Sequence, residues 1–90
     1  MEIEFDPHRS EENERLRGLP FSMASDFDFE TALIAEDRRK DYGERRWIAL
    51  GQITGRAFVV AFTWRRGRLR VISFRKANSR ESQRYDQARS

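Results

Sequence analysis

Six basic side chains fall within twelve consecutive positions near the end of the chain: Arg65, Arg66, Arg68, Arg70, Arg75 and Lys76. Guanidinium groups bind phosphate oxygens two at a time, and they stabilise negative charge that develops on a phosphate. In RNA the 2′-hydroxyl can attack the neighbouring phosphate, so cleavage needs neither an external nucleophile nor a metal ion. The protein has to position the strand, remove a proton and stabilise charge. The cluster therefore indicates a phosphate site whose chemistry suits RNA.

Other catalytic residue types are scarce in this sequence. There is no cysteine, and His8 is the only histidine, so a metal site built on these residues is not expected, and neither is any cofactor. No Ser-His-Asp arrangement and no glycine-rich phosphate loop is recognisable. If the chain is an enzyme, we expect Lys, Glu or Tyr with a pKa moved toward neutrality to transfer the proton.

Charge is divided unevenly between the two halves of the chain. Residues 1–44 carry 6 basic and 13 acidic side chains, a net charge of −7, whereas residues 45–90 carry 12 basic and 2 acidic, a net charge of +10. Of the 18 basic residues all but Lys40 and Lys76 are arginine, which favours phosphate recognition over general solubility. The alternative is a dipolar surface that pairs with a partner protein or with the acidic half of the same chain.

The length of 90 residues predicts one small domain, residues 1–90. No apolar run approaches the roughly 18 residues of a membrane span, and the acidic start is unlike a signal peptide. We therefore expect a cytoplasmic protein without membrane contact.

The element pattern predicts an α+β fold of order β-α-α-β-β-β-β-α with an antiparallel sheet. Asp6-Pro7 begins a helix that ends at Gly18 and is anchored by Leu16 along a narrow stripe, and Pro20-Phe21-Ser22 begins a shorter one. The predicted strands cover residues 2–5, 31–35, 45–52, 57–64 and 68–74, and Asn78 begins the last helix. Strict alternation in the last strand would place Arg70, Ile72, Phe74 and Lys76 on one side and Leu69, Val71, Ser73 and Arg75 on the other.

Several residues admit two interpretations. Arg65, Arg66 and Arg68 surround a hairpin turn, where solvation and phosphate binding are equally good explanations. Arg75 and Lys76 lie at the end of a predicted strand, just before a helix N-terminus. Backbone N–H groups at a helix N-terminus favour phosphate, so phosphate binding is the better explanation for these two residues. Trp47 can stack on a base or join the core, and core packing is the better explanation for Phe62, Phe74 and Tyr85.

The order of residues resembles the BrnT family of toxins. The resemblance is carried by Ile-Glu-Phe-Asp-Pro at 3–7, Asn13, Arg-Gly-Leu-Pro-Phe at 17–21, Asp-Phe-Glu-Thr-Ala-Leu at 28–33, Glu-Arg-Arg-Trp-Ile-Ala-Leu-Gly at 44–51, Gly-Arg-Leu-Arg-Val-Ile-Ser-Phe-Arg-Lys-Ala-Asn at 67–78, Glu81 and Tyr85. Residues 68–85 are the most specific part. The resemblance implies a RelE-like fold and a metal-independent endoribonuclease that blocks translation and growth. It also implies a BrnA-like antitoxin, often in a heterotetramer that represses its own operon and contacts operator DNA through the antitoxin.

Carried over by position, the resemblance implies roles for individual residues. The expected catalytic residues are Arg46, Arg70, Arg75 and Lys76, with Lys76 as the proton-transfer group and Arg46 as a phosphate clamp that Glu44 orients. Ser73 is expected to support them, and the expected RNA-binding residues are Arg17, Arg65, Arg68, Trp47 and Tyr85. One position departs from the family, because Leu16-Arg17-Gly18 stands where relatives usually have Lys-His-Gly.

Arginine stays protonated near neutral pH, so Arg17 cannot replace a histidine base, although it can bind phosphate. Three functions therefore remain open. The first is an RNA-cleaving toxin, the second is a non-catalytic degenerate toxin that acts as an antitoxin-binding co-repressor, and the third is a plain RNA-binding module.

Overall fold

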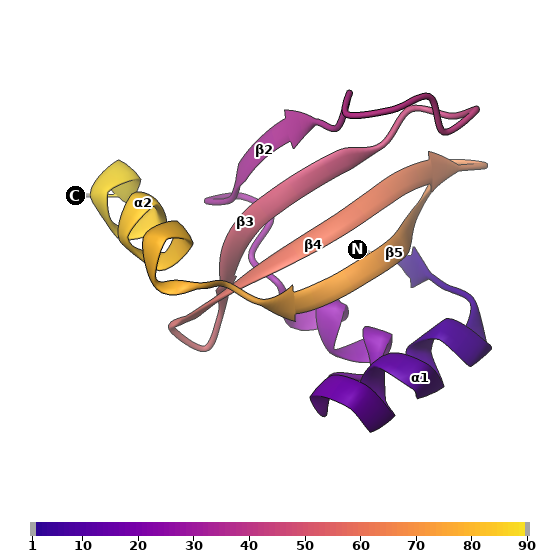
Figure 1. Cartoon of the computed structure of the whole chain (residues 1–90), viewed down its shortest axis with the longest axis horizontal. Coiled ribbons are helices and arrows are strands. Elements are labelled where there is room, and N and C mark those ends of the chain that lie inside the picture. Colours follow the sequence, from indigo (N-terminus) through magenta and orange to yellow (C-terminus); the bar gives the residue numbers. More distant parts are fainter. Residues whose placement is uncertain (1, 90) are drawn as a thin grey trace.

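The computed structural model describes residues 2–89 and contains a five-stranded sheet of order β1-β5-β4-β3-β2 (Figure 1). The elements are β1 (Ile3–Glu4), α1 (Pro7–Arg17), the 3₁₀ helix η1 (Phe21–Asp26), β2 (Leu33–Glu36), β3 (Trp47–Ile53), β4 (Arg56–Arg65), β5 (Arg68–Lys76) and α2 (Ser79–Arg89). The α+β class is confirmed. None of the helices in the described part is long and apolar enough to cross a membrane.

Two details of the predicted architecture are wrong. The second helix is a six-residue 3₁₀ helix, so α1 is the only α-helix between β1 and β2. The sheet is mixed rather than antiparallel, because β1 pairs in parallel with β5 while the other neighbouring pairs are antiparallel. A two-residue strand is too short to show its direction in a sequence pattern. The RelE-like arrangement stays a prediction.

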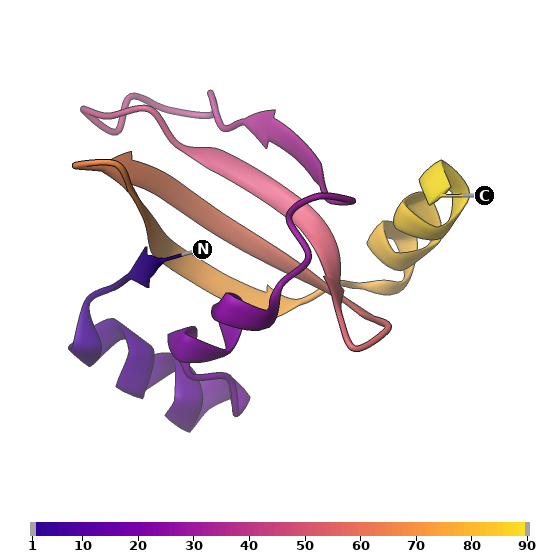
Figure 2. The same ribbon diagram turned by 180° about the vertical axis from the view of Figure 1, so that it is seen from behind.

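The two faces of the sheet carry separate apolar clusters. The main core lies on the face covered by η1 and includes Phe21, Val60 and Phe74. On the other face Leu50 and Val59 are buried with Tyr85 of α2. Figure 2 shows that α1 and η1 lie together near β1 and β5, while α2 lies at the opposite end of the molecule. One face is therefore well covered, and α2 covers only part of the other.

α1 begins and ends as the sequence predicts, but it is held differently. Asp6 caps the helix and accepts a hydrogen bond from the amide of His8, and Gly18 ends it with φ of +72°. Leu16, the predicted apolar anchor, is 71% exposed. Instead the Asn13 amide donates to the carbonyl oxygens of Leu19 and Phe74, at 2.7 and 2.9 Å. Hydrogen bonds thus tie a polar helix to the edge of β5.

An irregularity in β5 decides which arginines share a face. Ser73 pairs with Ala61 and Val71 pairs with Phe62, so Ile72 is an extra residue, as in a β-bulge. The bulge lets Phe74 join Leu69 and Val71 in the main core. The predicted strict alternation is therefore wrong, because Arg70, Ser73 and Arg75 lie together on the α2 face, opposite Thr63, Ala61 and Val59 of β4.

Candidate functional site

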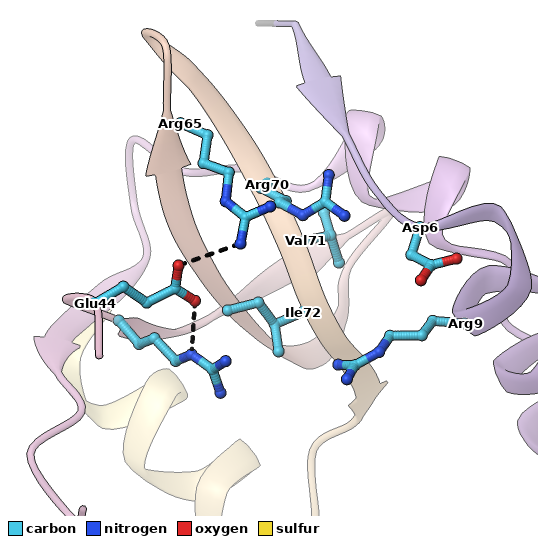
Figure 3. Close-up of a pocket in the computed structure, with 8 residues that line it drawn as sticks. Asp6, Arg9, Glu44, Arg65, Arg70, Val71 and Ile72 are labelled. Carbon is cyan, nitrogen blue, oxygen red and sulfur yellow. Dashed lines mark hydrogen bonds and ion pairs between the residues drawn. The ribbon is translucent and has the colours of Figure 1, made fainter. Parts of the chain in front are cut away.

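A pocket of about 160 Å³ lies between β5, the first turn of α1 and the segment before β3 (Figure 3). Its lining residues are Asp6, Arg9, Glu44, Arg46, Arg65, Arg70, Val71 and Ile72. We call it the arginine pocket. Figure 3 shows Arg65 and Arg70 converging above β5, while Arg9 extends toward the same strand from α1. Four of the predicted site residues, Glu44, Arg46, Arg65 and Arg70, are therefore brought together.

Glu44 holds two of these arginines. Its carboxylate accepts hydrogen bonds from Nε of Arg46 at 3.1 Å and from a terminal nitrogen of Arg65 at 3.4 Å. Burial alone would raise the pKa of Glu44, but the hydrogen bonds from Arg46 and Arg65 hold that pKa below its usual value. Glu44 is therefore an ionised, weakly basic group at neutral pH, and its geometry suits an orienting role.

The loop of residues 37–42, before β3, holds the Arg46 side chain in place. The Arg46 guanidinium carbon lies 4.2 Å from the centroid of the Tyr42 ring, within cation–π range. The Tyr42 hydroxyl donates to Asp37 at 2.9 Å, and the Asp37 side chain is only 4% exposed. Two hydrogen bonds from Arg39, at 2.8 and 2.9 Å, hold the pKa of Asp37 well below its usual range. Tyr42, Asp37 and Arg39 therefore hold Arg46 in place, and none of these three was among the predicted site residues.

Arg70 enters the arginine pocket from β5 and is paired only loosely. Its guanidinium lies 3.5 Å from the carboxylate of Glu4 on β1, and the two side chains are 27% and 30% exposed. The parallel pairing of β1 with β5 sets Glu4 directly beside Arg70. A partly exposed pair at this distance is weak, so a phosphate can compete for Arg70.

Four lining residues are not among the predicted site residues, and two of these, Asp6 and Arg9, are charged. The Arg9 guanidinium makes no hydrogen bond or ion pair with another residue in the range 2–89. The sequence does not reveal which side of α1 faces the sheet, because Asn13 rather than an apolar stripe sets that orientation. The position of Arg9 in the arginine pocket was therefore not predictable. Asp6 was recognised only as the cap.

The structure does not bring Arg75 and Lys76 to the arginine pocket. Both terminal nitrogens of Arg75 donate to Glu81 of α2 at 2.9 Å, and this hydrogen bonding raises the pKa of Arg75 above its ordinary value. Glu81 also accepts from the amide of Asn78, whose side chain caps α2 in return. Lys76 is exposed at the end of β5. Arg75 therefore links β5 to α2.

The remaining predicted residues are dispersed. Arg68 is exposed, with Glu2 at 3.5 Å. Trp47 stacks on Phe62 against the main core, and Tyr85 is 3% exposed with its hydroxyl 2.7 Å from the hydroxyl of Thr31. We assign Tyr85 to packing, because its ring is buried, whereas Trp47 is partly buried against the main core and its role in binding a base stays a prediction. Arg17 and Ser73 line a neighbouring cavity.

Within residues 2–89, no group of three or more histidine, aspartate or glutamate side chains is arranged to hold a metal ion. The four arginines of the arginine pocket can position a phosphate and stabilise charge on it.

Comparison with known proteins gives one match. The sequence model of a family described as "Ribonuclease toxin, BrnT, of type II toxin-antitoxin system" matches residues 5–81. No curated protein and no solved structure matches the chain. Because the match covers most of the 90 residues, the chain belongs to the BrnT family, the ribonuclease toxins of type II toxin–antitoxin systems.

Proposed function

We propose that this chain is a metal-independent endoribonuclease that cleaves RNA in the cytoplasm and so inhibits translation and growth. The observation that carries the proposal is the convergence of Arg9, Arg46, Arg65 and Arg70 on one pocket. Four guanidinium groups around a small hollow match the needs of a phosphate whose charge increases during reaction. The membership of a ribonuclease toxin family supports the same activity.

The proposed reaction is an internal transesterification. The 2′-oxygen of one nucleotide forms a bond to the adjacent phosphorus while the bond to the 5′-oxygen breaks. The 2′-hydroxyl loses its proton and the leaving 5′-oxygen gains one, so the products are a 2′,3′-cyclic phosphate and a 5′-hydroxyl. Arg46 and Arg70 bind the non-bridging oxygens and stabilise their extra charge. Lys76, the predicted proton-transfer residue, lies outside the arginine pocket, so we assign no proton transfer to it.

We further propose that a BrnA-like antitoxin neutralises the chain, in a heterotetramer that contacts operator DNA through the antitoxin alone. A type II toxin family implies an antitoxin partner. The arginine pocket is open and basic, so an acidic antitoxin segment laid across it would block RNA.

The test is cleavage of a defined RNA by purified protein in EDTA. We expect the wild-type protein to cut the RNA but not the same strand with deoxynucleotides at the cut positions, because the 2′-hydroxyl is the nucleophile. Removal of a charge-stabilising donor typically lowers kcat by about 10²–10³. We expect Arg46→Gln and Arg70→Gln each to show a loss of this size, with products analysed for the cyclic phosphate.

Arg56→Gln is the matched control, because Arg56 is an exposed arginine at the start of β4 and does not line the arginine pocket. It should cleave like the wild-type protein. Full activity in the double variant of Arg46 and Arg70 would contradict the site. A wild-type protein that binds antitoxin and operator complex but never cuts RNA or stops growth would instead identify a non-catalytic co-repressor.

A further inference from the structure

A second cavity of about 320 Å³ lies next to the arginine pocket, between α1 and β5. Its lining residues are Arg9, Glu12, Asn13, Leu16, Arg17, Phe21, Ile72 and Ser73. We call it the α1 groove. It shares Arg9 and Ile72 with the arginine pocket, so the two hollows adjoin each other.

The two arginines of the α1 groove differ from those of the arginine pocket. Arg46, Arg65 and Arg70 each lie against a glutamate. The guanidinium groups of Arg9 and Arg17 have no ion pair or hydrogen bond with any residue between 2 and 89. An unpaired guanidinium does not have to give up a carboxylate before it binds a phosphate.

The helix dipole alone would favour a basic residue where Arg17 stands. Arg15 also lies in the last turn of α1, yet it does not line the α1 groove. The dipole thus explains the charge of Arg17 but not its place on the wall of a cavity that adjoins the arginine pocket.

The α1 groove also has apolar walls. Leu16 is 71% exposed, and the β5 bulge turns Ile72 into the same cavity as well as the arginine pocket. A lone exposed leucine is ordinary on a protein surface. Here it lines a cavity together with Ile72 and two unpaired arginines, a combination that suits the flat apolar face and the phosphate of a nucleotide.

We propose that the α1 groove is a subsite for the nucleotide next to the scissile phosphate of a single-stranded RNA. Arg9 and Arg17 bind the flanking phosphate, and Leu16 and Ile72 contact the base. The strand must be single, because a base in a duplex is stacked and paired and cannot enter a side cavity. The inference rests on the proposed function, since that places the scissile phosphate in the arginine pocket.

The experiment measures binding of uncleavable 2′-O-methyl RNA by fluorescence anisotropy, with a strand of about ten nucleotides and a dinucleotide. We expect Arg17→Gln to weaken binding of the longer strand about tenfold and to reduce the salt slope by about 0.7, the value for one phosphate of a single strand. The dinucleotide has a single phosphate, which occupies the arginine pocket, and no flanking phosphate for Arg17 to bind, so Arg17→Gln and the wild-type protein should bind it equally.

Arg15→Gln is the matched control, because it removes the same charge from the same turn of α1 outside the α1 groove. It should leave both affinities unchanged. An equal loss in Arg15→Gln and Arg17→Gln would mean general attraction to a basic surface and would overturn the subsite. Unchanged binding of the longer strand by Arg17→Gln would overturn it as well.

The base contact is tested by Leu16→Ala against a strand that is abasic at each position in turn. The variant should bind the intact strand about threefold more weakly than the wild-type protein does, as expected for lost apolar contact. For the one strand that lacks the base at the α1 groove, the variant and the wild-type protein should have the same affinity. Equal losses on all strands would overturn the base contact. The subsite and the proposed function can be overturned separately. If the variants show these binding differences but the wild-type protein never cleaves RNA, the subsite is retained and the proposed activity is wrong.

Discussion

At the scale of single residues, the arginine pocket depends on carboxylates that hold guanidinium groups in place. Glu44 accepts hydrogen bonds from both Arg46 and Arg65, and its pKa lies below its usual value. A carboxylate with a lowered pKa is a poor proton acceptor near neutral pH. Its contribution to activity should therefore come from orientation.

We expect Glu44→Gln to lower kcat only about tenfold, because glutamine still offers an oxygen acceptor to Arg46. The dependence of kcat on pH below neutrality should keep its shape. Steady-state cleavage rates over a pH series test both points. Glu36→Gln is the control, since Glu36 holds Arg38 and Arg45 outside the arginine pocket. A fall of about 10²–10⁴ together with loss of the acidic limb would identify Glu44 as the general base instead.

The residues of the arginine pocket were only partly predictable. Glu44, Arg46, Arg65 and Arg70 were named from the arginine cluster and the resemblance, and they meet in one pocket. Arg75 came from the same reasoning, yet it is engaged by Glu81. Ion-pair partners that lie on different elements cannot be read from spacing. Tyr42 and Asp37 could not be predicted, because a polar loop has no periodic pattern of apolar residues that would show which side chains are buried.

At the scale of elements, the fold class and the places of the strands and of α1 were predictable, whereas the faces on which side chains lie were not. The apolar pattern located the strands, and Asp6 and Gly18 marked the ends of α1. The bulge at Ile72 has no sequence signature here, and it reverses the side on which Phe74 lies. Because of that reversal, Ser73 and Arg75 share the face of Arg70. Element boundaries thus follow from local chemistry, but the face of each side chain follows from pairing between strands.

The link between β5 and α2 should make stability depend on acid pH. Hydrogen bonds from Arg75 lower the pKa of Glu81 from 4.5 to about 2. A carboxyl whose pKa is depressed in the folded state stabilises the fold above pH 4.5, and this contribution is lost as the pH falls toward 2. We expect about 2 kcal/mol from Glu81 at pH 7, allowing for partial exposure of the pair.

Glu81→Gln should therefore lower the free energy of unfolding at neutral pH by about that amount and flatten its decline in acid. Urea unfolding at a series of pH values measures both effects. Asp86→Asn removes an exposed carboxylate from the same helix and should leave the pH dependence intact. An unchanged acid slope in Glu81→Gln would contradict the assigned pair.

At the scale of the whole molecule, the acidic half of the chain partly neutralises the basic half. Ion pairs that join the two halves are Arg45–Glu36, Arg46–Glu44, Arg65–Glu44, Arg68–Glu2 and Arg70–Glu4. The sequence allowed either phosphate binding or pairing with the acidic half, and the structure shows that the second occurs. The two are compatible when the pairs are exposed and weak, because RNA can then displace the carboxylates.

The pairs made by β1 provide the clearest test of this competition. Glu2 and Glu4 lie 3.5 Å from Arg68 and Arg70, and both pairs are solvent-exposed in part. We expect the double variant Glu2→Gln and Glu4→Gln to bind uncleavable single-stranded RNA about threefold more tightly at low salt, with the gain fading as salt screens the pairs. Glu11→Gln with Glu14→Gln is the control, because it removes the same charge from exposed positions of α1. An equal gain in the control would mean that net charge alone attracts RNA, and a weaker affinity in the β1 variant would mean that these carboxylates position the arginines rather than compete with phosphate.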